Sequence, residues 1–208
     1  MRLPCIKYHQ ISYLLDMTGW VWYWPKMNDV QTRQTFTPEQ VQILNQAVTM
    51  AEELVSNHFK MSASQWLHPK YDVKTLADLS PAEIVDGPFA QIIRYEGQRK
   101  GSTLGSEVYD YYKICLQDHA ILNALHNTLD LALLPFCLYI VTHELVHIVR
   151  FSKFLQNFDA SPNEKLAEEH RVHELTHLIL STVRLAGIER AIDYYHRWHA
   201  PLEKLCEQ

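Results

Sequence analysis

The stretch of the chain that decides its fold is PFCLYIVTHELVHIV, residues 135–149. The apolar run before His143 indicates a half-buried helix, whereas the plain alternative is a solvated surface helix that happens to carry histidines. His143 and His147 stand four residues apart and therefore share one helix face, one turn from each other. Two imidazoles at this spacing can reach one tetrahedral ion while the helix stays regular. The stretch predicts a site for a divalent transition metal, zinc above all.

Glu144 adds a possible chemistry to this pair of histidines. It directly follows His143 and lies within a turn of His147, so it can lean over the metal without being a ligand. Zinc lowers the pKa of a bound water to about 7, and a carboxylate in this position could accept a proton from that water. The pattern predicts metal-activated water with Glu144 as the catalytic general base.

The chain from residue 118 onward is expected to be helical. The expected helices cover residues 118–132, 135–158, 163–186 and 188–206, with a turn at 159–163. Gly187 is expected to end the third of them, because glycine is common just after a helix. This helical part, 118–206, would carry the metal site.

The first half of the chain mixes helix and strand signals. Thr37, Pro38 and Gln40 form a capping box that predicts a helix to about residue 59, and Ser80 with Pro81 starts a short second one. A small β element is expected at 89–116, with strands at 89–95 and 107–116 around a Gly-rich basic loop. The aromatic-rich part, residues 1–36, suggests a strand pair at 6–15 and 20–24. The expected fold is a single α+β domain over residues 1–208, mostly helical.

A tetrahedral zinc site needs a third protein ligand, and the candidates lie downstream on the predicted helix 163–186. Glu169-His170-Arg171-Val172-His173 begins 22 residues after His147. With the HELVH sequence at 143–147, this segment resembles the zincin metalloproteases, and among them the minimal, thermolysin-like gluzincins. The resemblance covers about residues 139–180. It implies that Glu169 is the third ligand and that His173, where the family has Asp or Asn, orients a histidine ligand.

Glu168 competes with Glu169 for that role. It shares a helix face with the apolar residues Val172, Leu175, Ile179 and Val183, so it should point toward the core. Consecutive helical residues point about 100° apart, so only one of the two glutamates should reach the ion. The ExxxH spacing to His173 favours Glu169, which we take as the ligand.

A second HExxH sequence, residues 173–177, repeats the first after 30 residues. The units Glu144–His147 and Glu174–His177, on facing helices, resemble half of a ferritin-like di-metal site. The alternative function is therefore a di-iron or di-manganese oxidoreductase, with His173 or His177 also possible as ligands of the ion. A non-catalytic metal-binding protein is a further alternative. The simplest interpretation of His170, His173, Glu174 and His177 is a solvated polar face, because they fall away from the apolar stripe.

Composition limits the partners and the compartment. A formal net charge of −5 without runs of like charge argues against nucleic-acid and membrane surfaces. The longest apolar run, residues 131–141, is short of the roughly 20 residues needed to span a bilayer. Four scattered cysteines without a CxxC pair are typical of free thiols in a reducing compartment, so a cytoplasmic location is expected.

The function expected from the sequence is a zinc metallopeptidase-like hydrolase. Its zinc would be held by His143, His147 and Glu169, and a peptide or protein would be its substrate. By the zincin resemblance, segment 107–116 would be the edge strand that aligns the substrate backbone. The candidates for stabilising the oxyanion are His170, His173, Tyr109, Tyr111 and Tyr112.

Overall fold

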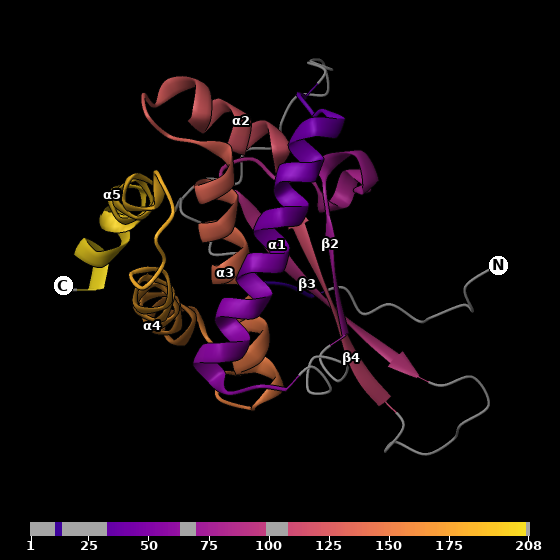
Figure 1. Cartoon of the computed structure of the whole chain (residues 1–208). Helices are drawn as coiled ribbons and strands as arrows, with labels where there is room; N and C mark the ends of the chain where they lie inside the picture. The colour runs from indigo at the N-terminus through magenta and orange to yellow at the C-terminus, as the bar shows by residue number, and fades with distance from the viewer. Residues whose placement is uncertain (1–10, 14–32, 63–69, 99–107, 207–208) are drawn as a thin grey trace.

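The computed structural model describes residues 11–13, 33–62, 70–98 and 108–206, and Figure 1 shows how their elements are arranged. The α-helices in these residues are α1 (Pro38–Phe59), α2 (Asp118–Asn127), α3 (Leu133–Ser152), α4 (Pro162–Leu180) and α5 (Ile188–Cys206). Two single-turn 3₁₀ helices, Leu76–Asp78 and Pro81–Glu83, follow the strand β2. The expected mostly helical α+β fold is confirmed at this level.

The strands β1 (Ile11–Tyr13), β2 (Lys70–Lys74), β3 (Ala90–Gln98) and β4 (Val108–Leu116) form one sheet in the order β1-β3-β4-β2. β3 and β4 pair antiparallel, as the expected β element requires, and β2 runs parallel to β4. Because β4 has a partner on each side, the expectation that segment 107–116 is an edge strand is wrong. β2 itself was not predicted, since its alternation of Tyr71 and Val73 with charged residues is too short to stand out.

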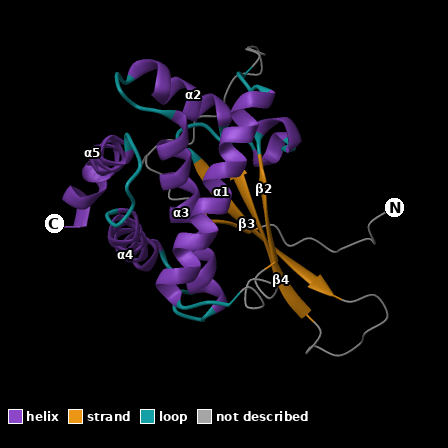
Figure 2. Cartoon of the chain, viewed as in Figure 1, coloured by secondary structure: helices purple, strands orange, loops and turns teal. Residues whose placement is uncertain are grey.

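Helix α3 is the central element of the molecule. It packs against α1, α4, α5 and β3, so that helices and sheet enclose it, as Figure 2 shows for α1 and the strands. Every residue from Pro135 to Phe151 is buried, including the polar ones. By length and composition α3 could cross a membrane, but 89% of its apolar window is buried inside the protein. Burial on all sides accounts for an apolar sequence without a polar face.

The helix starts follow local capping. The predicted box between Thr37 and Gln40 is present at α1, and a second box between Ser161 and Glu164 begins α4 at Pro162. Each box satisfies backbone N–H groups that have no partner inside the first helical turn.

The ends of α1 and α5 are those expected, at residues 59 and 206, whereas the ends of α2, α3 and α4 fall earlier. α2 ends at Asn127 rather than 132, and Asp130 shortly beyond it has a left-handed backbone (φ 66°). α3 ends at Ser152 rather than 158, and Phe154 (φ 55°) turns the chain back so that Phe158 packs on α3. α4 ends at Leu180 rather than 186, where the hydroxyls of residues 181 and 182 bond to carbonyls of the last turn. Gly187 therefore precedes α5 instead of ending α4.

One sequence expectation concerns residues that the structure describes only in part. Of the strand pair expected in the aromatic-rich segment, the structure describes β1 alone, which pairs with β3; the rest lies outside the described residues.

Cys115 and Cys137 are free and buried, as expected for thiols in the core. Burial raises the pKa of both thiols to about 12, which keeps them protonated and unreactive at neutral pH.

Candidate metal centre

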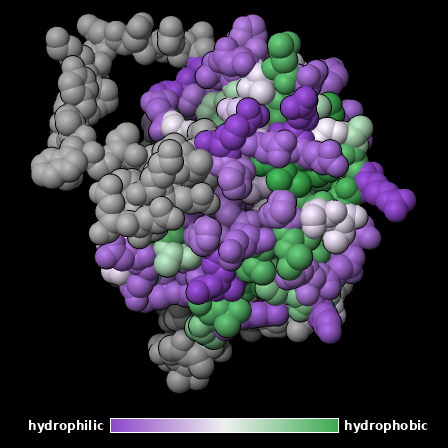
Figure 3. Space-filling view, turned by 90° about the vertical axis from the view of Figure 1, so that its left-hand side faces the viewer, coloured by the Kyte–Doolittle hydropathy of each residue, from purple (hydrophilic) through white to green (hydrophobic). Residues whose placement is uncertain are grey.

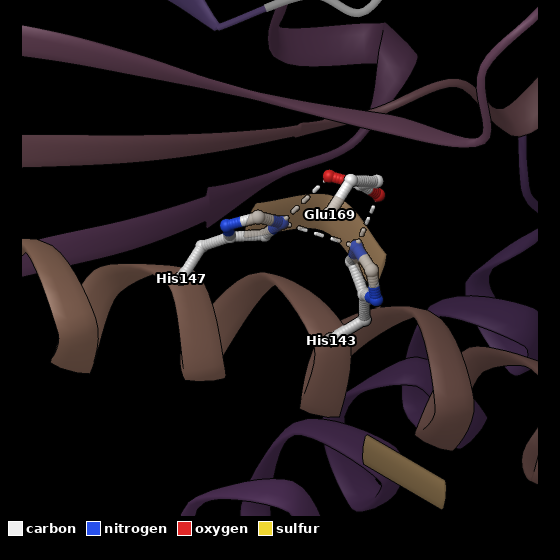
Figure 4. A group of neighbouring side chains, drawn as sticks. All are labelled: His143, His147 and Glu169. Atoms are coloured by element: carbon white, nitrogen blue, oxygen red, sulfur yellow. Dashed lines mark hydrogen bonds and ion pairs between the residues drawn. The ribbon is translucent and has the colours of Figure 1, made fainter. Parts of the chain in front are cut away.

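Three predicted ligands converge between α3 and α4. His143 and His147 project from one face of α3 toward Glu169 of α4 (Figure 4). Nε2 of His143 lies 2.9 Å from Oε1 of Glu169, and Nε2 of His147 lies 3.1 Å from Oε2. The two Nε2 atoms are 3.2 Å apart. We call these residues the His-His-Glu trio.

The spacing of these atoms allows one ion to be shared by all three residues. Zinc–nitrogen bonds are about 2.05 Å long, and the edge of a tetrahedron is about 1.63 times its centre-to-corner distance, or roughly 3.3 Å. The 3.2 Å between the two Nε2 atoms is close to that edge, and each imidazole has a different oxygen of the Glu169 carboxylate beside it, at 2.9 and 3.1 Å. Within the described part of the chain, the trio is the group of three or more potential ligands whose atoms lie within 4.8 Å of one another. Two imidazoles and a carboxylate are a donor set that suits a divalent transition metal such as zinc.

The choice between the two adjacent glutamates is decided by Arg150. The Glu168 carboxylate is buried and accepts two hydrogen bonds from the guanidinium of Arg150 on α3, and a third from Arg171. Because Glu169 points about 100° away on the helix, this ion pair sets α4 so that Glu169 meets the histidines. The apolar stripe correctly indicated a buried Glu168, but its partner is an arginine.

Contacts across the two helices run in opposite chain directions. Tyr139 contacts His173, His143 contacts Glu169, and Arg150 contacts Glu168. As the residue number rises along α3, it falls along α4. This is the antiparallel pairing on which the choice of a downstream ligand depended.

The charges of the trio influence one another. Burial raises the pKa of Glu169, but the charges and hydrogen bonds of His143 and His147 outweigh it and hold that pKa well below its ordinary value. Burial lowers the pKa of His147, but the charge of Glu169 and its hydrogen bond outweigh burial and raise that pKa above its ordinary value. Without metal the trio thus holds an ionised carboxylate hydrogen-bonded to the His147 imidazole, whose raised pKa favours protonation, so a proton takes the place of the metal charge.

Gln156 fixes the tautomer of His147. Its Oε1 lies 3.3 Å from Nδ1 of the imidazole and, being a carbonyl oxygen, can only accept a hydrogen bond from that nitrogen. A proton on Nδ1 leaves the lone pair of Nε2 for a metal. The corresponding Nδ1 of His143 is buried and has no hydrogen-bond partner among the described residues.

Glu144 lies beside the trio without belonging to it. It is 7% exposed on the buried helix α3. Burial raises the pKa of its carboxyl, and the charges of His143 and His147 partly oppose that rise. A raised pKa makes this carboxylate a better proton acceptor than an ordinary glutamate, which suits a general base.

Two tyrosines and His173 form the wall of the site next to His143. The Tyr139 hydroxyl is 3.0 Å from Nδ1 of His173, and Nε2 of His173 is 3.7 Å from Oε1 of Glu169. His173 therefore lies beside Glu169, and its ring centroid is 4.6 Å from that of His143. The role implied by the resemblance, that His173 orients a histidine ligand, stays a prediction. Tyr195 of α5 stacks on Tyr139 with ring centroids 4.3 Å apart and lies 5.9 Å from the ring of His143.

Neither Tyr139 nor Tyr195 was predicted from the sequence to be part of the site. Tyr139 lies one turn before His143, so the helical spacing could have revealed it. Tyr195 comes from α5, which nothing in the sequence connected with the metal. Its pKa is raised well above the ordinary value, first by burial and then by the charge of Glu144.

Most of the other candidates for the site lie elsewhere. Tyr111 lines a cavity between α1 and β2, and the hydroxyl of Tyr112 faces Asp110. The side chain of Tyr109 lies outside the described residues. Glu174 and His177 are exposed, so the two ExxH units do not form one group of ligands in the described structure.

Comparisons of the chain with protein families, with curated proteins and with solved structures find no match. The likeness to gluzincins therefore rests on the residues of the site themselves.

Proposed function

We propose that this protein is a zinc-dependent hydrolase that cleaves a peptide bond. The observation that carries the proposal is the convergence of His143, His147 and Glu169, whose ligand atoms lie within 4.8 Å of one another, with Glu144 on the histidine helix and outside the trio. Three protein ligands with one open corner are typical of catalytic zinc, whereas structural sites usually have four.

Each residue has a defined task in this scheme. Zinc, when bound, would lower the pKa of a water in the open corner and polarise the substrate carbonyl. Glu144 accepts the proton of that water and later donates it to the leaving amine. Gln156 holds the tautomer of His147 in which Nε2 can be a ligand, and Arg150 holds Glu168 away from the site.

Burial of the trio favours a second candidate, a metal that only joins helices. The side chains of His143 and His147 are 3% and 2% exposed, and that of Glu169 is 13% exposed. An ion there would connect α3 to α4 and contribute its binding free energy to folding. This protein would bind zinc and be stabilised by it, but would not hydrolyse peptides.

The substitution Glu144→Gln tests the proposal. The amide has nearly the shape of the carboxylate but cannot accept the proton, so hydrolysis of a fluorogenic peptide library should fall by about 10²-fold or more. The zinc of the trio should be retained, because Glu144 is not a ligand. His143→Ala is the matched comparison and should lose both zinc and activity.

Each alternative function predicts a different result. Zinc retained with no hydrolysis by either the natural protein or Glu144→Gln would contradict the hydrolase and support the structural metal. Release of metal by Glu144→Gln, with two irons or manganese ions in the natural protein, would instead support the di-metal oxidoreductase.

A further inference from the structure

A second set of metal-binding side chains lies on the other side of His173 from the trio. A cavity of about 490 Å³ opens between α4 and α5 and is lined by Tyr139 and Ile192 together with six titratable residues. These six are His170, His173, Glu174 and His177 of α4 and Asp193 and His196 of α5. Figure 3 shows the face formed by these helices, where hydrophilic side chains surround smaller apolar patches.

The donor set of this cavity suits a transition metal. Imidazole and carboxylate groups are the usual ligands of zinc, cobalt and nickel. No lysine or arginine is among its lining residues, which belong to the described part of the chain, so an anion would find no permanent positive charge there. The cavity contains the second HExxH sequence, residues 173–177, which the proposed hydrolase does not use.

Helix geometry places several of these donors on one stripe. At about 100° per residue, His170, Glu174 and His177 fall within about 60° of one another around α4. Nε2 of His170 already lies 3.5 Å from Oε1 of Glu174. Asp193 and His196 are three residues apart on α5 and face the same cavity, so ligands can come from both helices.

His173 separates this cavity from the trio. It lines the cavity, and it also contacts Tyr139 and Glu169 on the side of the trio. Because its Nδ1 lies 3.0 Å from the Tyr139 hydroxyl and its Nε2 lies 3.7 Å from Glu169, His173 is assigned to the side of the trio, and the other four histidine and acidic groups remain for a second ion together with Asp193. The ligand atoms of the remaining donors lie farther apart than those of the trio, which is the one group in the described residues whose ligand atoms are within 4.8 Å of one another. The side chains of His170 and Glu174 are 55% and 68% exposed, and exposed side chains change rotamer at small cost.

We propose that His177, His196 and the pair His170–Glu174 bind a second divalent transition-metal ion in the cavity between α4 and α5. Asp193 lines the same cavity and would complete the coordination. This ion binds more weakly than the one in the trio, because its ligands must first rotate into place. The two sites share no ligand, so this proposal stands or falls independently of the hydrolase.

Zinc titration of the full-length, metal-free protein by calorimetry tests the proposal. The natural protein should bind two zinc ions, one tightly and one weakly. The variant His177→Ala/His196→Ala should lose the weak ion and keep the tight one. A matched control, His58→Ala/His126→Ala, removes two exposed histidines outside both sites and should leave both ions bound.

Cobalt provides a second measurement of the same variants. Cobalt in the cavity should add visible absorption to that of the trio, and the added band should disappear in His177→Ala/His196→Ala. A natural protein that binds the tight ion alone would overturn the proposal, as would a second ion that survives this substitution or vanishes in the control. If Glu169→Ala abolishes the tight ion and the weak one remains, the second site is supported. If the natural protein shows only the weak ion, and that ion depends on His177 and His196, the hydrolase fails while the second site is upheld.

Discussion

Replacing Arg150 by Met should weaken both the fold and the metal site. Arg150 and Glu168 are 8% and 5% exposed, and the guanidinium donates two hydrogen bonds to the carboxylate. The variant removes one partner of a buried ion pair and leaves the other charge in the core between α3 and α4. Only Arg171, with a side chain 57% exposed, would still neutralise Glu168.

The magnitude follows from this burial. Breaking a buried pair by removing one partner costs about 3–5 kcal/mol of unfolding free energy. For a chain of this length each kcal/mol corresponds to a shift of roughly 2–4 °C, so the melting temperature should fall by about 6–20 °C. Arg171→Met removes a mostly exposed partner of the same carboxylate and should cost about 1 kcal/mol or less. Zinc affinity should fall as well, because Glu168 would no longer fix the rotation of α4 that aims Glu169.

Urea unfolding with a chelator present measures the stability of each variant, and competition with a chromophoric chelator measures zinc affinity. The double variant Arg150→Met/Glu168→Met restores an apolar contact between the helices and should recover most of the stability. Unchanged stability of Arg150→Met would refute the energetic role of the ion pair. Lower stability with unchanged zinc affinity would refute the idea that the pair positions Glu169.

Two further predictions concern pH and the core. In metal-free protein the pKa of His147 is raised, so the stabilisation from His147 is complete below pH 6.5 and is lost as pH rises through the folded pKa. The pKa of Glu169 is lowered, so the stabilisation from Glu169 is complete above pH 4.5 and is lost as pH falls through the folded pKa. The stability difference between the natural protein and Glu169→Gln, measured by urea unfolding with a chelator, should therefore be largest between pH 4.5 and 6.5, and a difference independent of pH would contradict this. Asp118→Asn should lower the free energy of unfolding by about 1–3 kcal/mol in the same assay. The two buried carboxylate oxygens of Asp118 each accept a hydrogen bond from a backbone N–H group, one from Phe36 and one from Leu76, whereas an amide has only one acceptor oxygen. The exposed Asp78→Asn is its control, and equal stability of the two variants would contradict the prediction.

The sequence alone determined those parts of the molecule that depend on neighbours within a turn or two. The start of α1 is set by Thr37 and Gln40, three residues apart, and the strands β3 and β4 by their own β-branched and aromatic residues. The shared face of His143 and His147 follows from helical geometry alone. These features could be predicted because the interactions that create them are local.

The ends of the helices depended on less regular contacts. Hydroxyls at residues 181 and 182 follow the end of α4, which falls seven residues before Gly187, and a left-handed Phe154 turns the chain after α3. A glycine and a continuing apolar pattern were the stronger local signals, so the sequence predicted longer helices. Which of several possible stops is used depends on where the following segment packs.

Only the tertiary structure decided which glutamate joins the histidines and which strand is internal. Glu168 and Glu169 are adjacent and chemically identical, and the choice between them depends on Arg150, 18 residues away on another helix. β4 is internal because β2, from a distant part of the chain, pairs with it. Tyr195 reaches the site only because α5 packs against α3. Contacts between segments far apart in the chain leave no periodic pattern in either segment, so they become visible only when the segments are packed together.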